Sequence, residues 1–188
     1  MIERERDKKT CSRRCFLLGV PGIILSPLFL SGLPGVKEEK PRRPLVELFS
    51  SEEWAALQES SMALEIDNYF GRGYSCSEAM LFWALKRLSM PEDLVWAAAA
   101  YGGGLGQKDL CGFLTGAMIA LGLAAGKMPL ERTEAKKEVA RRGKEYWNWW
   151  REKYPLHCRD IISAEGDREI CRKIGAVAAA RAERLLFS

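Results

Sequence analysis

One stretch limits the possible folds of this chain more than any other, the apolar run from Cys111 to Leu123. Within it, Gly112, Gly116 and Ala120 recur at every fourth position. Residues four apart lie on one face of an α-helix, so these small residues predict a flat stripe against which another backbone can pack closely. A segment that is apolar on all sides is typical of a buried helix. We therefore expect a Gly/Ala-rich helix at the centre of a helical bundle.

The rest of the chain after residue 49 also carries helical signals. Ser75 and Glu78 match the capping-box pattern, which predicts a helix that begins at Cys76. No segment alternates apolar and polar residues over the length of a strand. Proline and glycine separate the other predicted helices, which lie at about 51–70, 91–101, 130–154 and 168–186. We predict an all-α fold, a bundle of about five or six helices with short connections.

The composition is that of a globular protein with one domain. Of the 188 residues, 47% are hydrophobic and 29% are charged, which excludes a disordered tail, a collagen-like repeat and a polytopic membrane protein. The formal net charge of +4 comes mostly from the first 35 residues, which hold six Lys or Arg and three Asp or Glu. The remainder is nearly neutral, so we expect no nucleic-acid partner.

The N-terminal segment has the layout of an export signal. A basic start is followed by an apolar stretch from Cys15 to Val36, and residues 12–18 read Ser-Arg-Arg-Cys-Phe-Leu-Leu, which resembles the twin-arginine motif. We predict a signal or membrane anchor at 1–36, a linker at 37–49 and a helical domain at 50–188. We expect export by the twin-arginine translocase, to the periplasm or to the outer side of the cytoplasmic membrane.

The helical domain contains four cysteines, because Cys11 and Cys15 fall in the predicted signal. Three of the four lie at predicted helix starts, where unpaired N–H groups stabilise a thiolate and lower its pKa. Four thiolates brought together suit an iron–sulfur cluster or, as the alternative, zinc. Export of a folded protein favours a cofactor inserted before transport. The candidate redox or metal residues are Cys76, Cys111, Cys158 and Cys171.

Other uses of the cysteines stay open. They could be buried apolar residues, two structural disulfides of an interaction domain, or a long-range pair of a thiol–disulfide enzyme. No C-x-x-C is present to form a local dithiol, and the absence of C-x-x-C-H argues against covalent haem. His157 is a second candidate ligand, or a hydrogen-bond donor to a cluster sulfur, although a solvent-facing ring is the simpler interpretation.

Two further patterns bear on the site and its partners. The triple glycine before Cys111 lacks the strand and the Lys of a phosphate-binding loop, so it predicts a backbone that passes close to a helix or a cofactor. The aromatic run 146–150 covers nearly a full helical turn, which predicts that part of it is exposed to a partner, another subunit or the membrane interface. The residues expected to shape the site are Gly102, Gly103, Gly104, Gly112 and Gly116.

With these cysteines and glycines in place, the sequence resembles a known family, the redox-active proteins named for their C, GCAxxG, C, C pattern. The resemblance covers roughly 75–186, most of the predicted domain. The family is related to a domain of split-Soret cytochromes, and this relation implies iron–sulfur binding.

These observations together predict an exported redox protein that transfers electrons to or from an unidentified partner protein. Electron transfer is expected more than turnover of a substrate. A homodimer that shares the ligands is left open.

Overall fold

The computed structural model describes residues 43–165 and 168–188. The predicted signal at 1–36 lies outside these residues. The described residues belong to one compact unit, whose fold is given below. Among the described residues, no helix is both long enough and apolar enough to cross a membrane.

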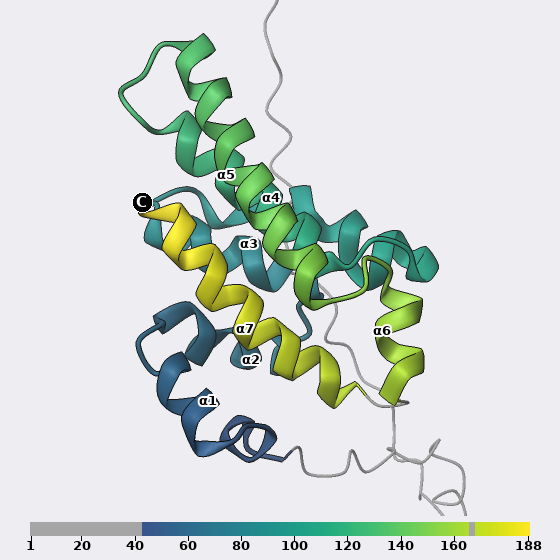
Figure 1. The fold of residues 1–188 in the computed structure, drawn as a ribbon. Helices are drawn as coiled ribbons and strands as arrows, with labels where there is room; N and C mark the ends of the chain where they lie inside the picture. Colours follow the sequence, from purple (N-terminus) through teal and green to yellow (C-terminus); the bar gives the residue numbers. More distant parts are fainter. Residues whose placement is uncertain (1–42, 166–167) are drawn as a thin grey trace, which may run out of the picture. The chain divides into compact units, whose positions relative to one another are not determined.

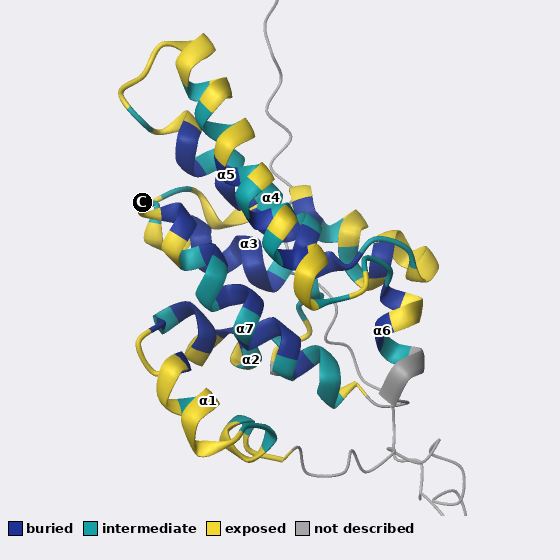
Figure 2. Ribbon diagram, in the orientation of Figure 1, coloured by how far each residue is buried: buried dark blue, intermediate teal, exposed yellow. Residues whose placement is uncertain are grey.

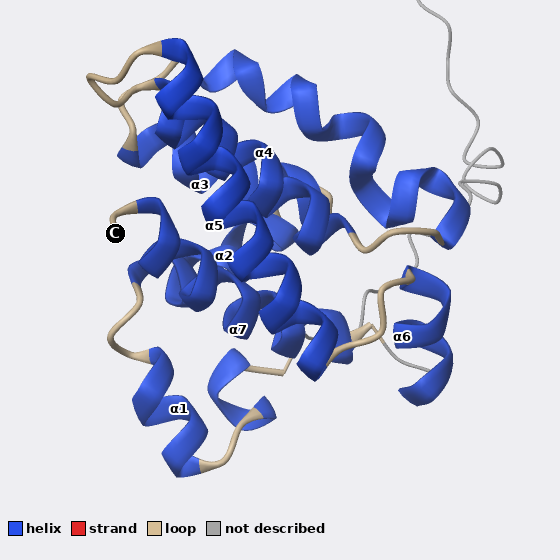
Figure 3. Ribbon diagram, turned by 45° about the horizontal axis from the view of Figure 1, so that its top comes forward, coloured by secondary structure: helices blue, strands red, loops and turns tan. Residues whose placement is uncertain are grey.

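The prediction of an all-α fold is confirmed. Figure 3 shows helices joined by loops, with no strand in the described part of the chain. Short 3-10 helices occur at η1 (Leu45–Leu48) and η2 (Glu92–Tyr101), and a distorted turn at η3 (Gly104–Lys108). The α-helices are α1 (Ser51–Leu57), α2 (Ser61–Gly71), α3 (Cys76–Arg87), α4 (Gly112–Gly126), α5 (Arg132–Lys153), α6 (Cys158–Glu165) and α7 (Glu169–Leu186).

The described residues form more helices than predicted, and one reason is that the segment expected as one helix at 51–70 divides into α1 and α2. Ser60 lies at the break, where its extended backbone and its hydroxyl, which accepts from the Ala63 N–H, cap a new helix. Glu183 of α7 supports this cap, because its carboxylate accepts from Ser60 Oγ at 2.5 Å and from the Met62 N–H at 3.1 Å.

The helix α4 is buried at the centre of the domain, as the sequence predicts. It packs against α3, α5 and α7, and Figure 2 shows these helices as buried where they meet. At Gly116 a Cβ atom would lie 2.6 Å from the carbonyl oxygen of Ser77, so the two backbones touch there. Gly175 of α7 gives similar room to the Phe113 ring.

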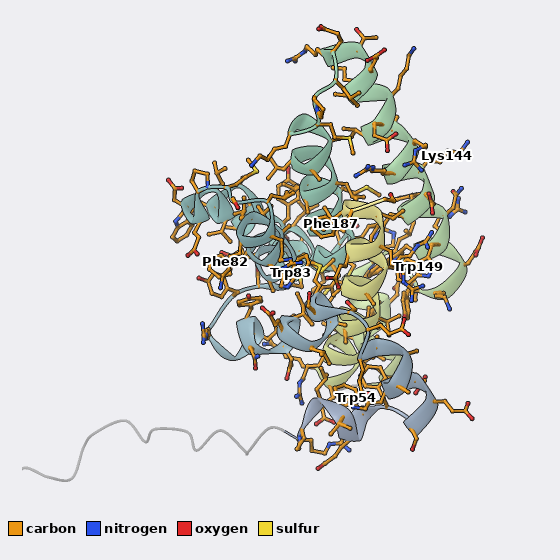
Figure 4. The ribbon with its side chains drawn as sticks, turned by 90° about the vertical axis from the view of Figure 1, so that its left-hand side faces the viewer. Trp54, Phe82, Trp83, Lys144, Trp149 and Phe187 are labelled. Atoms are coloured by element: carbon orange, nitrogen blue, oxygen red, sulfur yellow. The ribbon has the colours of Figure 1, made fainter. Side chains whose placement is uncertain are left out.

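The helix α7, the last of the chain, packs against the core and also contacts the first described helix, η1. In Figure 1 it lies beside α2 and α5, and both contacts are present in the structure. Near its end Phe187 meets Trp83 of α3, with ring centroids 6.3 Å apart (Figure 4). Within the predicted linker at 37–49, Leu45 and Phe49 pack against the core, and η1 contacts α7.

Candidate functional site

The four predicted cysteines all lie at or near helix starts. Cys76 is the first residue of α3, Cys111 directly precedes α4, and Cys171 is the third residue of α7. Cys158, which the sequence placed in a loop, is the first residue of α6. Cys111 and Cys158 are buried, whereas Cys76 and Cys171 are half-buried.

A short backbone pairing joins the segments that carry Cys111 and Cys158. The Cys111 N–H donates to the Leu156 carbonyl at 2.9 Å, and the Cys158 N–H donates to the Asp109 carbonyl at 2.7 Å. These two bonds frame an isolated antiparallel bridge between Leu110 and His157. Residues distant in sequence are therefore held side by side at the start of α4.

Two glycines leave room for Cys76 to pack against the start of α4. A Cβ atom on Gly112 would lie 2.1 Å from Cys76 Sγ, so the missing side chain leaves the space that this sulfur occupies. The backbone at Gly102 also packs closely on Ser75, the residue before Cys76. A Cβ on Gly102 would lie 2.4 Å from Ser75 Cβ. The Ser77 hydroxyl, on the other side of Cys76, donates to the Ala98 carbonyl at 2.8 Å and fixes α3 to η2.

The loop between η2 and α4 is folded tightly over Cys158. Gly103 and Gly104 have φ angles of +61° and +65°, which glycine adopts without strain. A Cβ on Gly104 would lie 2.8 Å from Cys158 Cβ, so the loop backbone packs directly on this cysteine. Leu105, at φ +57°, adopts the same left-handed region at a steric cost and is exposed.

The cysteines influence one another's ionisation. Burial raises the pKa of the Cys111 thiol, and the neighbouring charges of Cys76 and Cys171 raise it further. The N–H groups of Phe113 and Leu114 lower that pKa, although the thiol makes no capping hydrogen bond. The net direction is therefore opposite to the lowered pKa that a helix start predicts, because removal of a thiolate from water outweighs the helix terminus.

Cys158 behaves in the same way. Burial raises the pKa of its thiol and the charge of Cys76 adds to the effect, while Lys108 and Arg168 lower it. Cys76 is thus within electrostatic reach of both Cys111 and Cys158, and Cys171 is within reach of Cys111. Backbone pairing and the space at Gly112 bring Cys76, Cys111 and Cys158 together at the start of α4. The charge of Cys171 acts on the pKa of Cys111.

His157 is held by Asp109 rather than left alone. Its Nδ1 lies 2.5 Å from Asp109 Oδ1, and the imidazole ring is 35% exposed. This bond orients the ring and leaves Nε2 as the other nitrogen for a ligand or a hydrogen bond. The sequence ranked His157 second to the cysteines and gave no sign of its pairing with Asp109.

The four cysteines offer the sulfur donors of a thiolate-bound metal, but their side chains are not gathered around one point. Within 43–165 and 168–188, no three His, Cys, Asp or Glu side chains are placed so that they could hold one metal ion together. A rotation between χ1 rotamers moves a cysteine sulfur by roughly 3 Å. The space beside Gly112, which Cys76 Sγ occupies, shows that the start of α4 accepts a sulfur at close range.

A buried tyrosine near the site was not among the sequence candidates. Tyr146 of α5 has no solvent exposure, and its hydroxyl donates to the Ala178 carbonyl at 3.3 Å. Burial raises the pKa of this phenol well above its usual value, and the charge of Cys111 contributes to the rise. Its spacing of four from Trp150 on α5 was the available signal that both rings face the core.

Comparison with known proteins gives a family. The model of a family described as "Putative redox-active protein (C_GCAxxG_C_C)" matches residues 74–185. This chain belongs to that family. Neither the curated proteins nor the solved structures yielded a match. In this C_GCAxxG_C_C protein the matched range contains all four cysteines of the site. Phe113 stands where the family pattern has Ala, and the Cys76 sulfur occupies the space that a methyl group on Gly112 would fill.

Proposed function

We propose that this chain is an exported redox protein that binds an iron–sulfur cluster through Cys76, Cys111, Cys158 and Cys171 and exchanges electrons with a partner protein. The observation that supports the proposal is geometric: the Cys76 sulfur lies against Gly112, directly after Cys111, and the backbone bond from Cys158 to Asp109 brings a third cysteine to the start of α4. Membership of a redox-active family supports it.

The electrostatics favour a cationic centre. Several thiolates buried together repel one another, and loss of hydration adds to the cost. A metal centre removes this cost, because its positive charge stabilises the deprotonated thiols. Lys108 and Arg168 already lower the pKa of Cys158, and the N–H groups of Phe113 and Leu114 do so for Cys111. These groups would assist ligation without being ligands.

The chain would hold and tune the cluster in three ways. A bound iron–sulfur cluster supplies reversible one-electron exchange. The helix starts of α3, α4 and α6 set the directions of the cysteines, and the loop at Gly104 covers Cys158. Hydrogen bonds and apolar residues around the sulfurs control water access and so tune the potential. Phe113 and Leu114, both buried, provide apolar surface directly after Cys111.

Export remains part of the proposal. The twin-arginine-like residues 12–18 and the apolar stretch from Cys15 to Val36 support passage of a folded, loaded protein through the twin-arginine translocase. The segment would be cleaved or would anchor the chain on the outer side of the cytoplasmic membrane. Replacement of Arg13 and Arg14 by Lys should then leave the protein in the cytoplasm, as cell fractionation would measure.

Cluster loading is the direct test. The full chain is purified without oxygen, and its visible absorption, iron and acid-labile sulfide are measured on one sample. We expect iron and sulfide in the unchanged chain. Each of the variants Cys76→Ser, Cys111→Ser, Cys158→Ser and Cys171→Ser should lose at least about half of the bound iron, because a hydroxyl is a poor ligand for these clusters.

Cysteines outside the domain provide the matched control. Cys11→Ser and Cys15→Ser should keep full loading, because both lie in the predicted signal. A fully loaded Cys111→Ser protein would overturn the proposal. Zinc without iron would indicate a structural metal site. A metal-free protein in which Cys76 and Cys111 form a reversible disulfide would instead support thiol–disulfide exchange, since the Cys76 sulfur lies against Gly112, the residue after Cys111.

A further inference from the structure

Four aromatic rings form a continuous network at the end of α5. Tyr146 lies 5.3 Å from Trp149 and 6.3 Å from Trp150, as measured between ring centroids. Tyr154 lies 5.3 Å from Trp150 and 6.0 Å from Trp149. Tyrosine and tryptophan are the side chains, apart from cysteine, that most readily lose one electron to a radical. We call these four residues the aromatic network; Figure 4 labels Trp149.

The network is joined to Cys111 by a short hydrogen-bonded path. The Trp150 indole N–H donates to the Pro155 carbonyl at 3.0 Å. The next residue, Leu156, accepts from the Cys111 N–H at 2.9 Å. Cys111, Tyr146 and Trp150 also belong to the same buried core. Bonds and packed atoms therefore run without a gap from Cys111 to the indole of Trp150.

The four residues of the aromatic network differ in solvent exposure. Tyr146 and Trp150 have no solvent exposure, whereas Trp149 and Tyr154 are half-buried. The Tyr146 hydroxyl donates to a backbone carbonyl, which is not a base, so an oxidised Tyr146 could not release its proton there. Tyr154, which is partly exposed, can pass its phenol proton to water. Of the two tyrosines in the network, Tyr154 is therefore the one where an oxidised side chain can lose its proton and form a stable radical.

We propose that the aromatic network carries oxidising equivalents away from Cys111 to Tyr154, where a reductant from solution can remove them. The proposal deepens the proposed function and rests on it, because a redox site that meets oxygen outside the cytoplasm needs protection of its thiols from radicals. Unrepaired thiyl radicals lead to sulfinic and sulfonic acids, which are not reversed under ordinary conditions.

The electrons and protons of the proposed reaction balance as follows. In the chain without a cluster, where Cys111 is a free thiol, a one-electron radical oxidant takes an electron from this thiol, whose proton is lost, and leaves a thiyl radical. Trp150 gives an electron to this sulfur, which takes up a proton, and Tyr154 then gives an electron to Trp150 and its phenol proton to water. The net change moves one electron and one proton from Tyr154 to Cys111. A reductant of the ascorbate class restores Tyr154.

The test uses azide radicals, a small one-electron oxidant, on the full chain after metal removal and thiol reduction. A spin trap marks protein radicals, and peptide mass spectrometry measures trap adducts at Tyr154 and sulfinic and sulfonic acid at Cys111. In the unchanged chain we expect Tyr154 to be the most heavily trapped tyrosine. In Tyr154→Phe and in Trp150→Phe we expect at least a threefold rise in overoxidised Cys111.

Tyr74→Phe is the matched control, because Tyr74 is also half-buried and packed on other rings but lies outside the network. It should leave Cys111 oxidation unchanged. The reactivity of Cys111 toward a bulky thiol reagent, measured in each variant, separates loss of the relay from opening of the site. Equal Cys111 oxidation in Tyr154→Phe and the unchanged chain would overturn the proposal. The metal-free protein is used, so this outcome is independent of a failure to load a cluster.

Discussion

At the scale of single residues, burial and helix position act in opposite directions on the site thiols. Cys111 sits where helix N–H groups stabilise a negative charge, yet its pKa is raised because the thiol is buried beside other cysteines. The sequence located Cys111 at the helix start correctly. It could not supply the burial or the neighbours, which decide the direction of the shift.

The raised pKa of Cys111 predicts a loss of stability in alkali for the metal-free, reduced chain. The folded thiol holds its proton more tightly than the unfolded one, whose pKa is near the ordinary value of 9.0. The stabilisation is therefore complete below pH 9 and is lost as the pH rises above it. We expect the free energy of unfolding to fall between pH 8.5 and 9.5 in this protein, with a slope of up to about 1.4 kcal/mol per pH unit from this group.

Urea unfolding at several pH values measures this slope. Cys111→Ala should have a smaller slope over the same range, whatever its stability at pH 7. Tyrosines contribute mainly at higher pH, because their ordinary pKa is 10.0 and burial raises the pKa of Tyr69 to about 12. An equal slope in Cys111→Ala and the unchanged chain would show that Cys111 is not the titrating group.

At the scale of the helices, local signals located most elements, and tertiary contacts set their divisions. The capping box of Ser75 and Glu78 forms as predicted, and α5 lies within two residues of its predicted bounds. The break between α1 and α2 was missed, because it depends on Glu183 from α7. The start of α6 at Cys158 was also missed, because the pairing of Asp109 with this segment lies outside its local sequence.

The close packing of α3 on α4 depends on Gly116, so a side chain at this position should lower the stability of the domain. In Gly116→Ala the new Cβ would lie 2.6 Å from Ser77 O and 2.8 Å from Ser77 Cα, both backbone atoms that cannot rotate away. The two helices would have to separate, so we expect a loss of about 1–3 kcal/mol in the free energy of unfolding. Denaturant unfolding measures it.

Gly122→Ala on the same helix is the control. Nothing lies within 4 Å of a Cβ at Gly122, so alanine there should leave stability unchanged or raise it by up to about 1 kcal/mol through its higher helix propensity. Similar losses in both variants would mean that helix α4 responds to alanine in general rather than to contact with Ser77.

At the scale of the whole domain, a buried arginine ties α5 to the end of α7. Arg142 is 1% exposed, and its guanidinium donates to the Leu186 carbonyl at 3.2 Å, the Ser188 carbonyl at 2.5 Å and Glu138 at 2.6 Å. These carbonyls follow the last turn of α7, where they have no partner within the helix. Arg142 therefore holds the C-terminal end of α7 against α5.

Arg142→Met should lower the free energy of unfolding by about 2–4 kcal/mol, because the buried Leu186 carbonyl and the Glu138 carboxylate lose the guanidinium as their donor. Arg141→Met, one position along, is the matched control and should change stability by less than about 0.5 kcal/mol, since Arg141 is exposed and its ion pairs with Glu138 and Glu145 lie at the surface. Thermal or urea unfolding of both variants compares them. A loss in Arg142→Met no greater than in Arg141→Met would contradict this role.

The sequence by itself determined the all-α class, the buried Gly/Ala-rich helix and the four cysteines, because helix periodicity, capping and small-residue spacing are local properties. It also indicated the family, through the order of those cysteines. The approach of Cys76, Cys111 and Cys158 at the start of α4 was decided by the tertiary structure alone. Which part of the aromatic run 146–150 is buried was decided there too, although the spacing of Tyr146 and Trp150 indicates that their two rings share a face. Burial and contact depend on which helices pack together, and no local pattern contains that information.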